Sequence, residues 1–208
     1  MFILSIVLTA VAAYLLGGIN GAIIISKHVF KKDVRSFGSG NAGLTNFMRA
    51  FGRGWAAGVI GIDFLKGVAA CAIGGLLVSR LGYGIEGRAL GGLFVILGHM
   101  FPIYYGFKGG KGIMTGAAVG LMIDWRILVT ILIIFIIGTA LSRIVSVGSI
   151  LAAAGFPLSC ILFDIGGTAV LAITTVMAAM VIFMHRGNIA RIIKGEENRL
   201  TMDQFRKQ

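Results

Sequence analysis

Three polar segments of this 208-residue chain combine glycines with basic side chains, a pattern typical of sites that bind anions. The first segment, residues 35–49, reads RSFGSGNAGLTNFMR. Its glycines allow positive φ angles and expose backbone N–H groups, and Arg49 adds a fixed cation. Such a loop suits a phosphate or another oxyanion, although a plain turn with helix-capping residues would have a similar composition. Its candidate residues are Ser39, Gly40, Asn41, Thr45, Asn46 and Arg49.

The second segment, residues 98–112, reads GHMFPIYYGFKGGKG. Lys108 and Lys111 lie in its glycine turn, directly before an apolar helix. The N–H groups of such a turn, here those of Gly109 and Gly110, favour an anion together with the helix dipole. The other interpretation is a pair of lysines whose side chains reach toward the membrane boundary.

The third segment, residues 185–197, reads HRGNIARIIKGEE. Asn188 could cap a short interfacial helix, and the alternative is a basic tail that lies on anionic lipid. A smaller polar segment, Ser142-Arg143, lies between two apolar stretches. By itself it cannot be distinguished from an ordinary cytoplasmic cap.

Asp63 and Lys66 lie inside an otherwise apolar stretch, three residues apart. This spacing places them on one face of a helix, where they can form an ion pair. Ionisable groups at membrane depth each cost roughly 3 kcal/mol on insertion scales, and they usually have a function. The alternative is a buried pair that only fixes helix packing.

The composition determines which elements hold these residues. Hydrophobic residues make up 57% of the chain, charged residues 13%, and mean hydropathy is +0.95. A water-soluble globule cannot bury so much apolar surface, and with only 2 prolines the chain is not collagen-like. We therefore predict an all-α, polytopic membrane protein. With a net charge of +11, its expected partners are anionic lipids or an anionic substrate rather than nucleic acid.

Seven apolar spans are predicted within a single domain, residues 1–208. They are Phe2–Ser26, Trp55–Ser79, Ala89–Tyr105, Ile113–Ile123, Trp125–Leu141, Val147–Phe163 and Gly167–Met184. The fourth is too short for a straight crossing, so we expect a short or re-entrant helix there. The odd-numbered connectors and the C-terminal tail hold 15 of the 19 Lys and Arg residues, and the even-numbered connectors hold three. The positive-inside rule then places the N-terminus outside and the C-terminus in the cytoplasm.

Three other known motifs match this sequence only in part, and each lacks a feature that its function requires. Residues 38–43 match GxGxxG, but an apolar helix rather than a strand precedes them. The spacing from Gly106 to Lys111 is one residue short of a Walker A loop. His28 and Asp33 have HxxxxD spacing, but no downstream acidic Pro-Glu-Gly element accompanies them. Because the three histidines lack carboxylate partners at metal-ligand spacing, we predict no metal site and no cofactor.

The three main motifs, in this order on seven apolar spans, resemble those of the bacterial acyl-phosphate:glycerol-3-phosphate acyltransferase family. They read SGNAGLTNFMR, GHMFPIYYGFKGGKG and HRGNIARIIKGEE, and the DFLKG and SRIVS stretches that begin at Asp63 and Ser142 are also similar. Members of this family are integral inner-membrane enzymes. They move a fatty acyl group from acyl phosphate to the 1-hydroxyl of glycerol 3-phosphate, which gives lysophosphatidic acid and phosphate.

The resemblance implies direct attack by the glycerol hydroxyl without an acyl-enzyme, at a site that faces the cytoplasm. Acyl phosphate and glycerol 3-phosphate are then the substrates, and membrane lipids surround the protein. The soluble enzyme that makes acyl phosphate is an implied partner.

Roles for individual residues follow from the resemblance as expectations. Ser39 and Arg49, with their loop, would hold phosphate and the reacting carbonyl. Lys108 and Lys111, with the Gly109-Gly110 backbone, would hold the second phosphate or offset developing charge. His99 and His185 are candidates to accept the hydroxyl proton or to act as structural hydrogen-bond donors, and a substrate phosphate oxygen could accept the proton instead. The remaining expected substrate-binding residues are Gly40, Asn41, Thr45, Asn46, Lys66, Lys108, Gly109, Gly110, Ser142, Arg143, Asn188, Arg191 and Glu196.

The alternative function is a membrane transporter for organic phosphates or other small anions. A transporter typically has its site at the bilayer midplane and often an internal repeat. The polar motifs here lie at one interface, and no repeat is evident. Only the Asp63–Lys66 pair favours a site at depth.

Overall fold

The computed structural model describes residues 2–200, and all structural statements below concern that part of the chain. It contains helices and no strands in this range. The α-helices are α1 (Phe2–Gly17), α2 (Gly21–His28), α3 (Leu44–Phe51), α4 (Ala56–Ser79), α5 (Gly84–Met100), α6 (Ile113–Ile123), α7 (Trp125–Ser142), α8 (Val145–Leu162), α9 (Gly167–Met184) and α10 (Arg186–Ile193). Two short 3-10 helices, η1 (Val34–Ser36) and η2 (Ile103–Tyr105), lie in the connections.

Six helical segments between residues 2 and 200 are long and apolar enough to cross a membrane. They are Phe2–His28, Ala56–Ser79, Gly84–Tyr105, Trp125–Ser142, Val145–Leu162 and Gly167–Met184. The helix α6 is apolar but has only 11 residues. The all-α prediction is therefore confirmed, and α6 has the bounds predicted for the short fourth span.

The first predicted span is not one continuous helix. α1 ends at Gly17 and α2 begins at Gly21. Asn20 caps α2, because its side-chain oxygen accepts a hydrogen bond from the Ile23 N–H at 3.0 Å. The Gly21 N–H donates to Asp63 Oδ1 at 3.2 Å, and the Ile19 carbonyl accepts from Lys66 Nζ at 2.6 Å. The backbone of the break is thus satisfied by polar side chains, which irregular backbone inside a membrane protein requires.

Close helix packing at small residues joins α1, α4 and α5. A Cβ atom on Gly98 of α5 would lie 3.0 Å from the Cα atom of Gly17. One on Gly91 would lie 3.3 Å from the Cα atom of Cys71 in α4. Side chains at these glycines would push the helices apart, so the backbones can approach only because they are absent.

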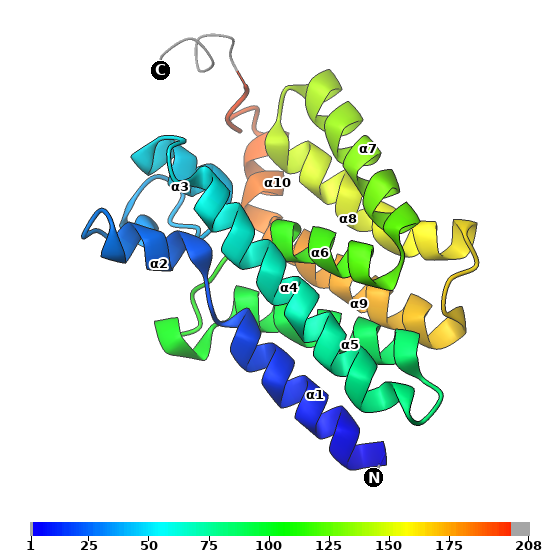
Figure 1. The fold of residues 1–208 in the computed structure, drawn as a ribbon. Coiled ribbons are helices and arrows are strands. Elements are labelled where there is room, and N and C mark those ends of the chain that lie inside the picture. Colours follow the sequence, from blue (N-terminus) through cyan, green and yellow to red (C-terminus); the bar gives the residue numbers. More distant parts are fainter. Residues whose placement is uncertain (1, 201–208) are drawn as a thin grey trace.

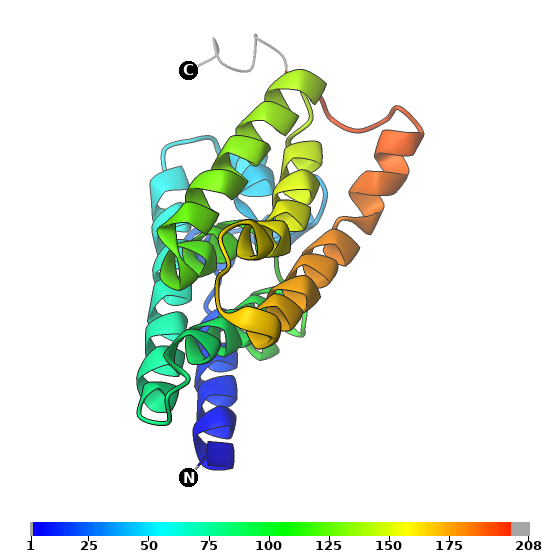
Figure 2. The same ribbon diagram turned by 90° about the vertical axis from the view of Figure 1, so that its right-hand side faces the viewer.

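The polar loops gather at one end of the molecule. In both views the start of α1 lies at the bottom, while α3 and α10 lie toward the opposite end (Figures 1 and 2). The short helix α6 lies in the middle of the bundle and packs against α4, α5, α7 and α8 (Figure 1). Its N-terminus follows the second polar segment, so a half-length helix brings that segment beside the other two.

Candidate active site

A cavity of about 540 Å³ brings the first and third motifs together with Lys111. Ten of the candidate residues line it: Ser39, Asn41, Thr45, Asn46, Arg49, His99, Lys111, His185, Asn188 and Arg191. The other candidates do not: Gly40, Lys66, Lys108, Gly109, Gly110, Ser142, Arg143 and Glu196. The structure adds polar lining residues that were not among the candidates: Asp63, Ser146, Ser149, Glu197 and Asn198.

Asn46 holds the first loop in shape. Its amide nitrogen donates to the carbonyls of Val34, Phe37 and Asn41 at 3.0–3.1 Å, and its oxygen accepts from the Ser39 N–H at 3.1 Å. Asn46 therefore positions Ser39, and its own polar atoms are already used within the loop.

The helix that follows the first loop has two different faces. Phe47 and Phe51 of α3 pack against Phe30, with ring centroids 4.7–6.0 Å apart. Thr45 and Arg49, four residues apart, line the cavity. Because residues at this spacing share a helix face, burying the aromatic face turns these two side chains toward the cavity.

The glycine turn of the second motif does not present open N–H groups, contrary to expectation. Gly109 N–H donates to the Met100 carbonyl at 3.1 Å, and Gly110 N–H donates to the His99 carbonyl at 3.0 Å. A Cβ atom on Gly110 would contact His99 Nε2 and lie 2.7 Å from the Ala42 oxygen. The glycines therefore let this turn fold tightly onto the end of α5 and onto the first loop.

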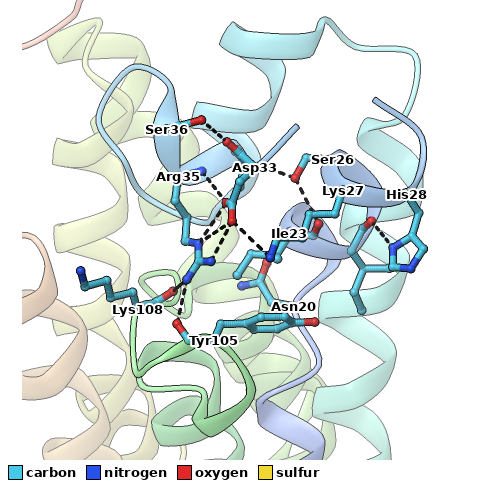
Figure 3. Close-up of polar contacts among 12 residues, drawn as sticks. Asn20, Ile23, Ser26, Lys27, His28, Asp33, Arg35, Ser36, Tyr105 and Lys108 are labelled. Carbon is cyan, nitrogen blue, oxygen red and sulfur yellow. Dashed lines mark hydrogen bonds and ion pairs between the residues drawn. The ribbon is translucent and has the colours of Figure 1, made fainter. Parts of the chain in front are cut away.

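Arg35 joins the first and second loops (Figure 3). Its guanidinium donates to both carboxylate oxygens of Asp33 at 2.7–3.3 Å, and to the carbonyls of Tyr105 and Lys108 at 2.7 and 3.3 Å. The hydrogen bonds from Arg35 hold the pKa of Asp33 well below its usual value, so the carboxylate stays charged. We call this arrangement of Asp33, Arg35 and the two carbonyls the Arg35 clamp.

Lys108 lies outside the main cavity. Its side chain is exposed and lines a separate surface hollow with Asp33, Arg35, Gly40 and Tyr105. Of the two lysines in the glycine turn, only Lys111 reaches the main cavity. The structure therefore does not bring the two lysines together in one cavity.

Glu197 connects the third motif to α8. Its Oε1 accepts from Ser146 Oγ at 3.0 Å and from Asn188 Nδ2 at 2.6 Å, and its Oε2 accepts from Arg191 Nε at 2.7 Å. Burial opposes the charged form, but these hydrogen bonds keep the pKa of Glu197 below its usual value. The adjacent Glu196, which the sequence favoured, is exposed and lies outside the cavity.

Three cations face the cavity around this carboxylate. Lys111 Nζ donates to Asn188 Oδ1, so Asn188 links the lysine to Glu197. Burial, with repulsion from Arg191 and Arg49, lowers the pKa of Lys111 to about 8, although Glu197 opposes the shift. Two carboxylates line the same cavity, Glu197 and Asp63, and Asp63 is already paired with Lys66. Three cations against the one remaining carboxylate leave a surplus of positive charge that suits an anion.

The two cavity histidines have different partners. His185 Nδ1 lies 2.8 Å from the Val181 carbonyl, which can only accept, so Nδ1 carries the proton and Nε2 is an acceptor. Burial lowers the pKa of His185 to about 4, so the ring is neutral near pH 7. His99 Nδ1 lies 2.7 Å from Lys66 Nζ.

Lys66, Ser142 and Arg143 have structural contacts instead of a place in the cavity lining. Lys66 is 5% exposed and bonds to Asp63, Ile19 and His99. Ser142 Oγ donates to the Gly138 carbonyl at 2.6 Å and accepts from the Ile144 N–H at 3.1 Å. Arg143 adopts a left-handed conformation, φ 58°, and its carbonyl accepts from the Leu200 N–H at 2.7 Å. These last contacts shape the α7–α8 turn and hold the C-terminal segment.

A family model described as glycerol-3-phosphate acyltransferase matches residues 7–195. The chain belongs to this family. It is 39% identical over 194 residues to the glycerol-3-phosphate acyltransferase of Thermoanaerobacter pseudethanolicus, covering 93% of this chain and 95% of that protein. It is 35% identical over 200 residues to that of Finegoldia magna, covering 95% and 97%. The match decides for the acyltransferase over the transport alternative.

Two crystal structures of the integral membrane glycerol 3-phosphate acyltransferase PlsY are similar to this acyltransferase. The glycerol 3-phosphate form has a TM-score of 0.88 and the lysophosphatidic acid form 0.84. Both are 32% identical in sequence and cover 98% of this chain and all of the PlsY chain. The similarity establishes an integral membrane protein.

The Arg35 clamp gives a first prediction for the acyltransferase. We expect Arg35→Lys to lower kcat/KM by about tenfold, because one ammonium cannot hold Asp33 and two carbonyls as the planar guanidinium does. Steady-state acyl transfer by the purified variant measures this loss. Arg126 is a matched control, because it bonds Asp124 in the same way, two residues apart, without touching either loop. Equal losses in Arg35→Lys and Arg126→Lys would contradict the role of the clamp.

Proposed function

We propose that this acyltransferase takes its acyl group from acyl phosphate and transfers it directly to the 1-hydroxyl of glycerol 3-phosphate. The products are lysophosphatidic acid and inorganic phosphate. The observation that carries the proposal is that Arg49, Lys111 and Arg191 line one cavity, where they outnumber Glu197, the carboxylate that is not already paired with Lys66. Two phosphate-bearing substrates need such a surplus of positive charge.

The cavity also has an apolar portion that suits a fatty acyl chain. Its apolar lining residues come from membrane-spanning α4 and α7 and from α6, and they include Val59, Ile60, Ile113, Met114 and Phe135. An acyl phosphate can then place its chain among these side chains and its phosphate among the cations. Holding both ends supports catalysis by positioning and charge stabilisation.

The contacts of the serines and cysteines support direct transfer. Within residues 2–200, no serine hydroxyl hydrogen bonds to a histidine, and neither Cys71 nor Cys160 lines the cavity. The glycerol oxygen forms the new bond to the acyl carbon while the bond from that carbon to the phosphate oxygen breaks. Phosphate leaves with the bonding electrons, and no enzyme nucleophile is needed.

Two groups are candidates to accept the proton of the attacking hydroxyl, His185 Nε2 and a substrate phosphate oxygen. His185 presents Nε2 as an acceptor, but with a pKa of about 4 it is a weak base. A phosphate monoester has a second pKa of about 6, so it is a stronger base than His185. His185 therefore orients the hydroxyl by accepting its hydrogen bond, and a substrate phosphate oxygen takes the proton.

The proposed location is the cytoplasmic membrane of a bacterium, with the cavity open to the cytoplasm. The end of the molecule that holds the polar loops carries most of the basic residues, which the positive-inside rule assigns to the cytoplasm. A soluble enzyme that makes acyl phosphate would then deliver the donor from the same side.

Phosphate release by the detergent-purified protein tests the donor. We expect release from palmitoyl phosphate only when glycerol 3-phosphate is present, with an equal amount of lysophosphatidic acid found by mass spectrometry. Release without glycerol 3-phosphate, or product from acyl-CoA or acyl carrier protein but not from acyl phosphate, would contradict the proposal.

The lowered pKa of Lys111 predicts the pH profile of the reaction. The value of about 8 is that of the free enzyme, so we expect kcat/KM for glycerol 3-phosphate to fall as pH rises through about 8. The uncharged amine no longer holds phosphate. Lys111→Arg keeps its charge over this range and should lose the alkaline fall, even if its maximal rate is lower. An unchanged fall in that variant would assign the titration to another group.

A further inference from the structure

A buried polar chain connects the break after α1 to the cavity. Asp63 and Lys66 come from α4 and His99 from α5, and each residue is at most 5% exposed. Lys66 Nζ lies 2.8 Å from Asp63 Oδ1, 2.6 Å from the Ile19 carbonyl and 2.7 Å from His99 Nδ1. Asp63 Oδ1 also accepts from the Gly21 N–H at 3.2 Å.

The hydrogen bonds of the Lys66 ammonium determine the tautomer of His99. The Lys66 ammonium has three N–H donors, and its three neighbours are a carboxylate, a carbonyl and a ring nitrogen. His99 Nδ1 also lies 3.6 Å from Asp63 Oδ1, which is beyond hydrogen-bond distance, so Lys66 is its hydrogen-bond partner. All three donors of the ammonium are used only if Nδ1 accepts. A neutral imidazole that accepts at Nδ1 carries its proton on Nε2. Lys66 and Asp63 also balance each other's charge, as a buried pair requires.

The Nε2 side of His99 is the side available to a ligand. His99 lines the cavity, and among residues 2–200 no hydrogen bond to its Nε2 is present. The atom lies beside Gly110, where a Cβ would contact it. The same cavity has apolar lining residues on α4 and α6, including Val59, Ile60 and Ile113.

We infer that Asp63 and Lys66 hold His99 as a neutral Nε2–H donor, which hydrogen bonds the carbonyl oxygen of the acyl donor. The assignment of the ligand rests on the proposed function. As the glycerol oxygen attacks, negative charge grows on that carbonyl oxygen, and a fixed N–H donor stabilises it. Lys66 is then a positioning residue, and His99 is not a proton acceptor. His185 is the opposite tautomer, with its proton on Nδ1, and its Nε2 accepts a hydrogen bond instead of donating one.

Nitrogen NMR of the histidines tests the tautomer without any substrate. The chain has only three histidines, so ¹⁵N-histidine labelling of the full protein in detergent gives few signals. We expect His99 to be protonated at Nε2 and His185 at Nδ1, with assignment from His99→Gln and His185→Gln. A cationic His99, or one protonated at Nδ1, would overturn the inference even in a fully active enzyme.

The double variant Asp63→Asn/Lys66→Met tests the positioning, because it removes both charges and leaves no unpaired ion. We expect the Nε2–H preference of His99 to be lost and kcat to fall by about 100-fold, with KM for glycerol 3-phosphate within about threefold of wild type. Thr115→Val is the control. It removes the hydrogen bond from the Thr115 hydroxyl to the Asp63 backbone carbonyl and leaves the side-chain contacts among Asp63, Lys66 and His99 intact. An unchanged tautomer in the double variant, or an equal loss in the control, would overturn the positioning role.

The acyl-donor contact is tested with His99→Ala and His99→Gln. We expect His99→Ala to lower kcat by about 100-fold, and His99→Gln to recover part of it because the amide restores an N–H donor. A kcat unchanged in His99→Ala would overturn the contact. If wild-type protein with the Nε2–H tautomer used a donor other than acyl phosphate, the proposed donor would fail and the tautomer assignment would stand.

Discussion

Lys111→Met is expected to reduce kcat/KM for glycerol 3-phosphate by about 100- to 1,000-fold, the cost of removing one charge-stabilising donor from a catalytic cavity. Lys111 is part of the cation group with Arg49 and Arg191 and is hydrogen bonded to Asn188. Its loss removes a positive charge from the cavity proposed to hold the substrate phosphates. Methionine keeps much of the side chain's length, so packing in the cavity changes little.

Lys108→Met is the matched comparison, because Lys108 comes from the same turn and has the same chemistry. Its side chain is exposed and outside the cavity, so we expect kcat/KM within about threefold of wild type. Both values come from steady-state rates with glycerol 3-phosphate varied at a fixed acyl phosphate concentration. Similar losses in the two variants would mean that the surface hollow and the cavity act as one site.

The two lysines show what the sequence could and could not predict. Glycine and lysine composition indicated an anion site near residues 108–111, and Lys111 does line the cavity. Which lysine turns inward depends on the left-handed conformations at Gly106, Phe107 and Gly112, with φ angles of 63°, 59° and 82°. Composition does not encode these angles for a residue such as Phe107, where a positive φ is uncommon.

The apolar spans were predictable because a long run of apolar residues has few alternatives to a membrane helix. Predicted and observed ends differ by no more than two residues for Trp55–Ser79, Trp125–Leu141, Val147–Phe163 and Gly167–Met184. The break after Gly17 was not predictable, because Gly-Ile-Asn occurs within an apolar run. Its backbone is held by Asp63 and Lys66, more than 40 residues away in sequence.

Ser142 and Arg143 illustrate a different limit. The resemblance marked the stretch as part of the site. The serines that line the cavity are instead Ser146 and Ser149, which lie beyond the turn, in the first two turns of α8. Helical spacing places Ser146 and Ser149 on nearly one face, but the sequence alone does not say which face meets Glu197. The Ser146–Glu197 hydrogen bond between α8 and the C-terminal segment supplies that information.

Glu197→Ala is expected to lower kcat/KM by about 100-fold, because cavity side chains that we propose bind substrate would lose their orientation. Ser146, Asn188 and Arg191 would each lose their acceptor. Asn188 would then no longer be fixed where it accepts from Lys111. The rate should be measured together with thermal stability in detergent, so that unfolding is separated from misplacement.

Glu196→Ala is the control, since the neighbouring carboxylate is exposed, and we expect its activity within about twofold of wild type. The left-handed Gly195, φ 73°, turns the chain so that the second glutamate rather than the first points inward. Glu197→Gln separates charge from geometry, because its amide oxygen still accepts from Asn188 while Arg191 loses its ionic partner. A smaller loss in Glu197→Gln than in Glu197→Ala is expected if orientation dominates. Equal losses in Glu196→Ala and Glu197→Ala would contradict this placement of the C-terminal segment.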